Sequence, residues 1–134
     1  EKEVERSHNP RPLDYRYLED YIEDVEENGQ IRIITGDREI LPGIRVVHTP
    51  VHTEGGLTVF IDTPSGQAAI TGFCVIKENF YPPVQITAME MEVIPPGTLV
   101  NAYEAYDIML KVKHMADILL PLHEPEFASV DTIP

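Results

Sequence analysis

Apolar residues near the start of the chain recur at the spacing of a helix. From Tyr17 to Val25 they fall three and four positions apart, and acidic residues fill the positions between them. This periodicity predicts an amphipathic helix that ends at Asn28-Gly29. We expect its acidic face to be solvated rather than to bind a partner. The preceding residues 1–13 are predicted to be a connector, because Asn9-Pro10-Arg11-Pro12 disfavours regular structure.

From residue 30 the pattern changes to short β-branched runs, which are typical of strands. Turn residues separate these runs. Pro42-Gly43 suits the central pair of a type II turn, and Asp62-Thr63-Pro64-Ser65-Gly66 joins two runs in a predicted hairpin. The predicted strands are residues 31–35, 44–47, 57–61 and 67–71.

The second half of the chain predicts a loop, a helix and a strand. Residues 73–100 contain four prolines, which favours an irregular surface loop. A helix follows, because Asn101 can cap it and Glu104 completes the pattern of a capping box. The apolar stripe over residues 102–116 predicts a face that packs on the core. Residues 117–120 form a last predicted strand, and the order of elements indicates an α/β fold.

Composition narrows the class of protein. A length of 134 residues predicts a single domain over 1–134. The net charge of −13, without a Lys/Arg cluster, argues against a nucleic-acid partner, and no apolar run approaches the roughly 20 residues that span a membrane. One cysteine cannot form an internal disulfide, which predicts a reducing, cytoplasmic compartment. Because the sequence begins with Glu1 rather than methionine, we expect a processed or trimmed product.

Two histidines stand in loops just after strand-like runs. His52 lies within residues 48–56, and His123 lies within residues 119–127. A β-rich scaffold can direct such imidazoles at a shared metal ion, so we predict both as metal ligands. Two ligands are too few, because a stable divalent-metal site normally takes three or four.

Other residues with donor atoms are weaker candidates. His48 precedes His52 by four positions, but Pro50 lies between them and no helix aligns the two rings, so a ligand role is disfavoured. Cys74 could be a soft ligand, although we prefer a small buried residue there. The remaining candidates are two expected surface histidines and two acidic residues that could accept a hydrogen bond from a ligand: His8, His114, Glu78 and Glu124.

The stretch Val47-His48-Thr49-Pro50-Val51-His52-Thr53, with Gly55-Gly56 and the run to Ile70-Thr71-Gly72, resembles the C-terminal half of the metallo-β-lactamase superfamily, particularly its lactonase-like branch. The lead-in Arg38-Glu39-Ile40-Leu41-Pro42-Gly43-Ile44 also resembles that branch. The resemblance covers about residues 30 to 127. It implies half of an αββα sandwich, with a mostly antiparallel or mixed sheet flanked by helices.

The resemblance assigns roles to individual residues. His52 matches the histidine of the family's Thr-Pro-Gly-His-Thr segment and His123 that of its Pro-Gly-His segment, which implies that both bind metal. Phe73 stands where the family has a bridging aspartate, so a conventional dinuclear site is not implied. Ile76 stands where lactonases have a tyrosine, so lactone specificity does not carry over. The His-x-His-x-Asp-His motif of the family's N-terminal half does not occur in these residues.

The implied function is that of the C-terminal part of a metal-dependent hydrolase, which cleaves an ester, lactone, thioester or amide through a metal-bound water. Zn²⁺, or another divalent ion such as iron or manganese, would lower the pKa of that water and polarise the carbonyl of a small-molecule substrate. One alternative is a metal-free binding or assembly module that keeps the scaffold, which Phe73 favours. Another is a non-heme iron oxygenase or oxygen reductase of the same superfamily.

A half-scaffold also predicts partners. The missing metal ligands are expected from an N-terminal half or a partner chain, so the isolated chain is expected to be inactive. The sheet face that carries Leu57, Val59 and Ile61, or the opposite face, would lack its cover and expose an apolar patch. We therefore expect the chain to pair with a second chain or fragment as an oligomer.

Overall fold

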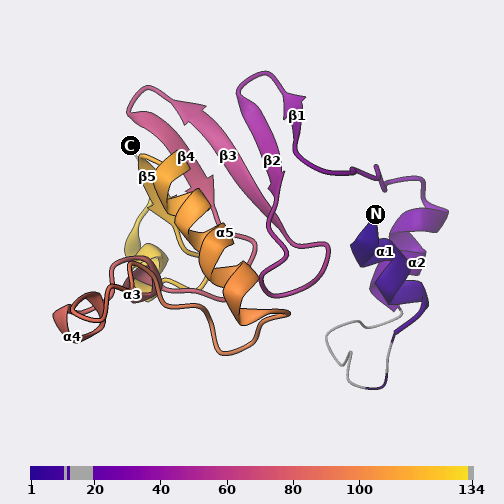
Figure 1. The fold of residues 1–134 in the computed structure, drawn as a ribbon. Coiled ribbons are helices and arrows are strands. Elements are labelled where there is room, and N and C mark those ends of the chain that lie inside the picture. Colours follow the sequence, from indigo (N-terminus) through magenta and orange to yellow (C-terminus); the bar gives the residue numbers. More distant parts are fainter. Residues whose placement is uncertain (11, 13–19, 133–134) are drawn as a thin grey trace. The chain divides into compact units, whose positions relative to one another are not determined.

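The computed structural model describes residues 1–10, 12 and 20–132 (Figure 1). The chain divides into two compact units, residues 1–36 and residues 37–134, and each is described by itself. Whether residues 1–134 form one domain stays a prediction.

The first unit contains two helices, α1 (Lys2–His8) and α2 (Asp20–Glu27). The ring Nε2 of His8 lies 2.8 Å from a carboxylate oxygen of Glu26, which joins the two helices. Gly29 has a positive φ of 65° and its amide donates to the Glu26 carbonyl, so the predicted helix end at Asn28-Gly29 is confirmed. The predicted helical residues from Tyr17 to Glu19 lie outside the described residues.

Helix α1 occupies part of the segment that was predicted as a connector. Its first turn carries Glu3 and Glu5 and its last turn carries Arg6 and His8, charges that suit the helix dipole. The side chain of Ser7 is buried and its hydroxyl donates to the Glu3 carbonyl over 2.9 Å. The prolines that suggested irregular structure follow this helix and do not interrupt it.

The second unit is built on a five-stranded sheet with the order β1-β2-β3-β4-β5. Neighbouring strands are antiparallel, except that β4 and β5 are parallel. The predicted fold class, α/β with a mostly antiparallel or mixed sheet flanked by helices, is therefore confirmed. The strands are β1 (Arg38–Leu41), β2 (Ile44–His48), β3 (Leu57–Thr63), β4 (Gly66–Ile70) and β5 (Ile118–Leu120).

The turns of this sheet follow the sequence closely. Gly43 has the positive φ, 75°, that a Pro-Gly type II turn requires between β1 and β2. The β3–β4 hairpin closes at Thr63 and Gly66, as predicted. The predicted strand at 31–35 is wrong, because no strand among the described residues pairs with it. Ile33 is 52% exposed there, and β-branched residues form strands only where they can pack and pair.

Helix α5 (Ala102–Met115) covers one face of the sheet (Figure 1). The side-chain oxygen of Asn101 accepts from the amides of Tyr103 and Glu104, so the predicted N-cap is confirmed. The helix buries a stripe against the sheet face that carries Phe60 and Ala69. The buried members of that stripe are Ala105, Met109 and Val112.

The segment 73–100 is more ordered than the predicted irregular loop. It contains two short helices, α3 (Lys77–Phe80) and α4 (Val84–Thr87), and the side chains of Phe73, Val75, Phe80 and Val93 are buried in the core. Asn79 donates from its side chain to the Ile94 carbonyl and accepts the Ile94 amide at its own carbonyl. Burial of large apolar side chains orders the segment despite its prolines.

The opposite face of the sheet is apolar as well. Side chains alternate along a strand, so Val59 and Ile61 point away from the face of Phe60. Their cross-strand partners continue the surface, and Ile70 is 37% exposed on it. The apolar residues of this face are Ile44, Val46, Leu57, Val59, Ile61, Ala68, Ile70, Ile118 and Leu120, and the register adds Arg38, His48 and Thr63 at its ends. None of the helices in the described residues is long and apolar enough to cross a membrane.

Candidate functional site

The two histidine loops lie at the same edge of the sheet. Strand β2 ends at this edge and the antiparallel β3 begins there, so residues 49–56 connect the two strands along it. Strand β4 and its parallel neighbour β5 both end there too, which places residues 71–76 and 121–124 at the edge. The topology therefore brings the loops of His52, Phe73 and His123 to one side of the molecule.

The loop 49–56 is held at several points. The amide of Thr49 donates to the Gly56 carbonyl over 2.8 Å, which closes the loop at its base. The Thr49 hydroxyl lies 3.0 Å from that of Thr58, and both residues are buried. The middle of the loop is fixed by Val51, whose side chain is fully buried and whose carbonyl accepts the Val100 amide.

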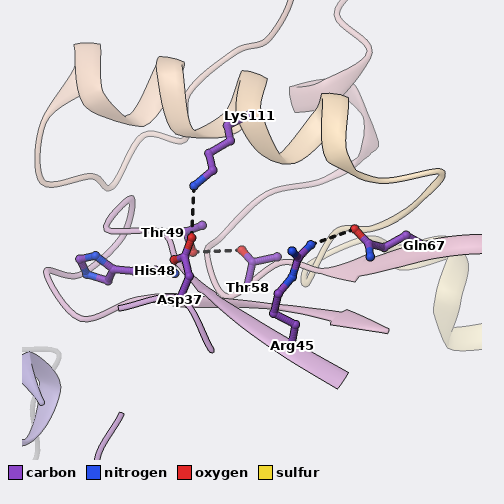
Figure 2. A network of polar contacts seen from close by, with 7 residues as sticks. All are labelled: Asp37, Arg45, His48, Thr49, Thr58, Gln67 and Lys111. Atoms are coloured by element: carbon purple, nitrogen blue, oxygen red, sulfur yellow. Dashed lines mark hydrogen bonds and ion pairs between the residues drawn. The ribbon is translucent and has the colours of Figure 1, made fainter. Parts of the chain in front are cut away.

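His48 braces this loop from its first strand. Its ring Nε2 lies 2.9 Å from the Glu54 carbonyl, and because a carbonyl only accepts, Nε2–H is the donor. Its amide donates to Asp37 Oδ1 over 2.8 Å, and the other carboxylate oxygen of Asp37 lies 3.5 Å from Lys111 Nζ on helix α5. Figure 2 shows Lys111 reaching from the helix to Asp37 beside His48. The sequence disfavours a ligand role for His48 and carries no signal for this brace, which depends on how the loop closes.

His52 is half-buried, and its ring is oriented by a backbone group. Its Nδ1 lies 3.3 Å from the Thr98 carbonyl. Because that oxygen can only accept, Nδ1 carries the proton and the lone pair is on Nε2. In metal-binding histidines, one ring nitrogen commonly bonds to a carbonyl in this way while the other binds the metal.

His123 is exposed, and its main chain is firmly placed. Its amide donates to the Val75 carbonyl over 3.0 Å. The neighbouring Leu122 amide donates to the hydroxyl of Thr71, which is 1% exposed. These contacts attach the end of β5 to the segment that follows β4.

Glu124 does not meet the imidazole of His123 as a hydrogen-bond acceptor in the described structure. Its carboxylate instead accepts the amides of Lys77, over 2.7 Å, and Glu126, over 3.3 Å. It thereby caps both α3 and the 3₁₀ helix η1 (Pro125–Ser129). The sequence indicated Glu124 as a possible acceptor for a ligand but did not reveal this role.

Phe73 belongs to the core. It is 1% exposed, and its ring lies 6.3 Å from that of Phe80 at an angle of 45°. A phenyl ring cannot coordinate a metal, and a carboxylate at this buried position would be costly without partners. Cys74 beside it is a half-buried free thiol.

The two predicted surface histidines are exposed, and the ring of each lies close to a carboxylate. His8 contacts Glu26 in the first unit, and the ring Nε2 of His114 lies 3.8 Å from Glu92. Glu78 is exposed. Within residues 1–10, 12 and 20–132, no group of three or more His, Cys, Asp or Glu side chains comes together to hold a metal ion. His52 and His123 therefore fit a metal only as part of a larger donor set.

Comparison with known proteins assigns the fold and its relatives. No protein-family model matches the chain. An N-acyl homoserine lactonase of Bacillus sp is 34% identical over 80 residues, which are 58% of this chain and 32% of the relative, and that of Bacillus cereus is 32% identical over the same shares. The structure of an N-acyl homoserine lactone hydrolase, with N-hexanoyl-L-homoserine bound at its catalytic metal centre, matches with a TM-score of 0.68 and 25% identity. That match covers 98% of this chain and 48% of the hydrolase. A quorum-quenching N-acyl homoserine lactone lactonase matches equally well, over 50% of its length.

These matches define the structural class of the chain. The chain has the fold of the metallo-β-lactamase superfamily, so the resemblance predicted from the sequence is confirmed. Its homologues within that class are N-acyl homoserine lactonases, which are lactone hydrolases. The chain spans about half the length of the solved structures that it matches.

Proposed function

We propose that this chain is the C-terminal part of a metal-dependent hydrolase that cleaves an ester, lactone, thioester or amide. The observation that carries the proposal is the fold match over 98% of the chain to a hydrolase with its product bound at a metal centre. The shared sheet edge of the loops that carry His52 and His123 supports it, since ligands from separate loops can converge there.

In this proposal His52 and His123 hold the metal ion. The ion, Zn²⁺ or a similar divalent metal such as iron or manganese, would supply Lewis-acid chemistry and lower the pKa of bound water. The Thr98 carbonyl sets the tautomer of His52, so that Nε2 is the ligating nitrogen. The bond from the His123 amide to Val75 fixes the main chain from which that imidazole projects.

The remaining ligands belong, in this proposal, to an N-terminal half or a partner chain. The solved lactone hydrolases are about twice as long as this chain, which supports such a complement. The apolar sheet face around Val59 and Ile61 is a surface that the complement would cover. An oligomeric assembly and a cytoplasmic location stay predictions.

Hydrolysis by the full-length native protein tests the proposal. The assay would use an acyl homoserine lactone, an aryl ester and a thioester as substrates, because the proposed reaction class includes all three. His52→Ala and His123→Ala are each expected to lower kcat/KM by about 100-fold or more. Each would remove a proposed metal ligand, which costs more than the loss of a residue that only orients a ligand. His114→Ala is the matched control, because this histidine is 64% exposed and is expected to leave activity unchanged. Hydrolysis that survives both substitutions would contradict the proposal.

A second candidate is a metal-free binding or assembly module, and Phe73 favours it. Its buried ring fills the position that the resemblance assigns to the bridging aspartate. In that case the full-length protein would bind no ion tightly and hydrolyse none of the three substrates. Metal analysis therefore separates the two candidates.

A further inference from the structure

Two segments that flank the candidate site meet through one carboxylate. Glu124 Oε2 accepts the amide of Lys77 over 2.7 Å, and Oε1 accepts the amide of Glu126 over 3.3 Å. The first bond joins two segments that are 47 residues apart in sequence. The second lies within the segment that carries His123.

This carboxylate completes a short ladder between residues 71–77 and 121–126. The Leu122 amide donates to the Thr71 hydroxyl, the His123 amide donates to the Val75 carbonyl, and the Glu124 carboxylate accepts from Lys77. Three successive residues of the His123 loop are thus attached to the segment that follows β4. His123 is the middle one of the three.

Glu124 is the strongest side-chain contributor to this attachment. A hydrogen bond from an amide to an ionised carboxylate is shorter and stronger than one between neutral groups. The other charged contact nearby, between Lys77 Nζ and Glu126, spans 3.6 Å with side chains 59% and 70% exposed, and such pairs contribute little. Removing Glu124 would also leave the first amide of α3 without its partner.

We propose that Glu124 is a positioning residue, which fixes the main chain of the His123 loop against residues 71–77 and so sets where the imidazole of His123 projects. The fixing of the loop stands on the hydrogen bonds alone. The consequence for a metal ion rests on the proposed function of His123.

The test compares Glu124→Ala, Glu124→Gln and Glu126→Ala in the full-length native protein. Amide hydrogen exchange is measured without metal, and the Kd for Zn²⁺ is measured by calorimetry. In Glu124→Ala, the amides of Lys77 and His123 should exchange about tenfold faster, and the Kd for Zn²⁺ should rise about tenfold, as for other residues that orient metal ligands. Glu124→Gln keeps one acceptor oxygen and should restore part of both values. Glu126→Ala should change neither, because the one contact that its side chain makes within the described part of the chain is the exposed ion pair with Lys77.

The outcomes separate this inference from the proposed function. Unchanged exchange at Lys77 and His123 in Glu124→Ala would overturn the inference, whatever the metal affinity. If Glu124→Ala does not fold, Glu124→Gln takes its place in the comparison. The inference would be overturned if Glu124→Gln keeps wild-type exchange and wild-type Zn²⁺ affinity while Glu126→Ala shows faster exchange. Faster exchange with an unchanged Kd for Zn²⁺ would overturn the positioning of His123. A wild-type protein that binds no Zn²⁺, with faster exchange in Glu124→Ala, would contradict the proposed function and leave the fixing of the loop supported.

Discussion

At the scale of single residues, two histidines four positions apart differ in the carbonyl group that each ring contacts. His48 donates from Nε2 to Glu54 and braces the loop, whereas His52 contacts Thr98 through Nδ1. The sequence indicates which histidines stand in loops, and the motif around His52 predicts that this residue is a metal ligand. It could not indicate the brace, because the Glu54 carbonyl reaches His48 only when the whole loop has closed.

Replacement of His48 tests this brace. His48→Ala removes the donor to the Glu54 carbonyl and should lower the free energy of unfolding by about 1 kcal/mol, the typical net contribution of such a hydrogen bond. Urea denaturation measures the loss, and amide exchange should rise within residues 49–56. His114→Ala is the control and should stay within about 0.5 kcal/mol of wild type, because its side chain is exposed. Equal losses for both variants would show that His48 has no special role.

At the scale of elements, local signals predicted the parts of the fold that carry their own stop and start residues. Asn101 marks the start of α5, and Pro42-Gly43 marks the turn between β1 and β2. The signals failed where tertiary contacts decide. Residues 31–35 have strand composition without a partner strand, and residues 73–100 have loop composition but bury aromatic side chains such as Phe73. The two histidine loops could be located from their motifs, whereas the contact from Glu124 to Lys77 joins distant segments and has no local signal.

Close packing of elements at the site edge depends on Gly72. A Cβ atom at this position would collide with the backbone oxygen of Leu57, where β3 begins after the His52 loop. Gly72→Ala must therefore shift the main chain, and should cost about 1–3 kcal/mol of unfolding free energy, as overpacked positions do. Gly97→Ala is the matched control, because no atom lies within 4 Å of its Cβ position. Chemical denaturation of the two variants compares them, and a Gly72→Ala protein as stable as Gly97→Ala would contradict the packing.

At the scale of the whole molecule, the chain combines an acidic net charge of −13 with a sheet that carries apolar side chains on both faces. Helix α5 covers the face of Phe60, and the face of Val59 and Ile61 is the surface that we expect another chain to cover. The sequence predicted that one face of the sheet would lack a cover but left open which face it is. Helix α5 packs on the face of Phe60, so the face of Val59 and Ile61 is the one that α5 does not cover.

Association of the isolated 134-residue chain tests the expected pairing. Light scattering after gel filtration should give a mass above 15.1 kDa, because burial of a continuous apolar face favours association. Ile61→Lys on that face should shift the chain toward a monomer, whereas a lysine in place of the exposed Val84 on α4 should not. A monodisperse wild-type monomer of 15.1 kDa that unfolds cooperatively would contradict the prediction.

The metal content of the full-length native protein tests the central claim most directly. Elemental analysis of the purified protein and of its His52→Ala, His123→Ala double variant compares proteins that differ only at the two proposed ligands. We expect at least about one tightly bound divalent ion per protomer in the wild type and a loss of that ion in the variant, because a site reduced by two ligands no longer holds it. A wild-type protein without metal, or a double variant that keeps its full complement, would contradict a metal site built on these two histidines.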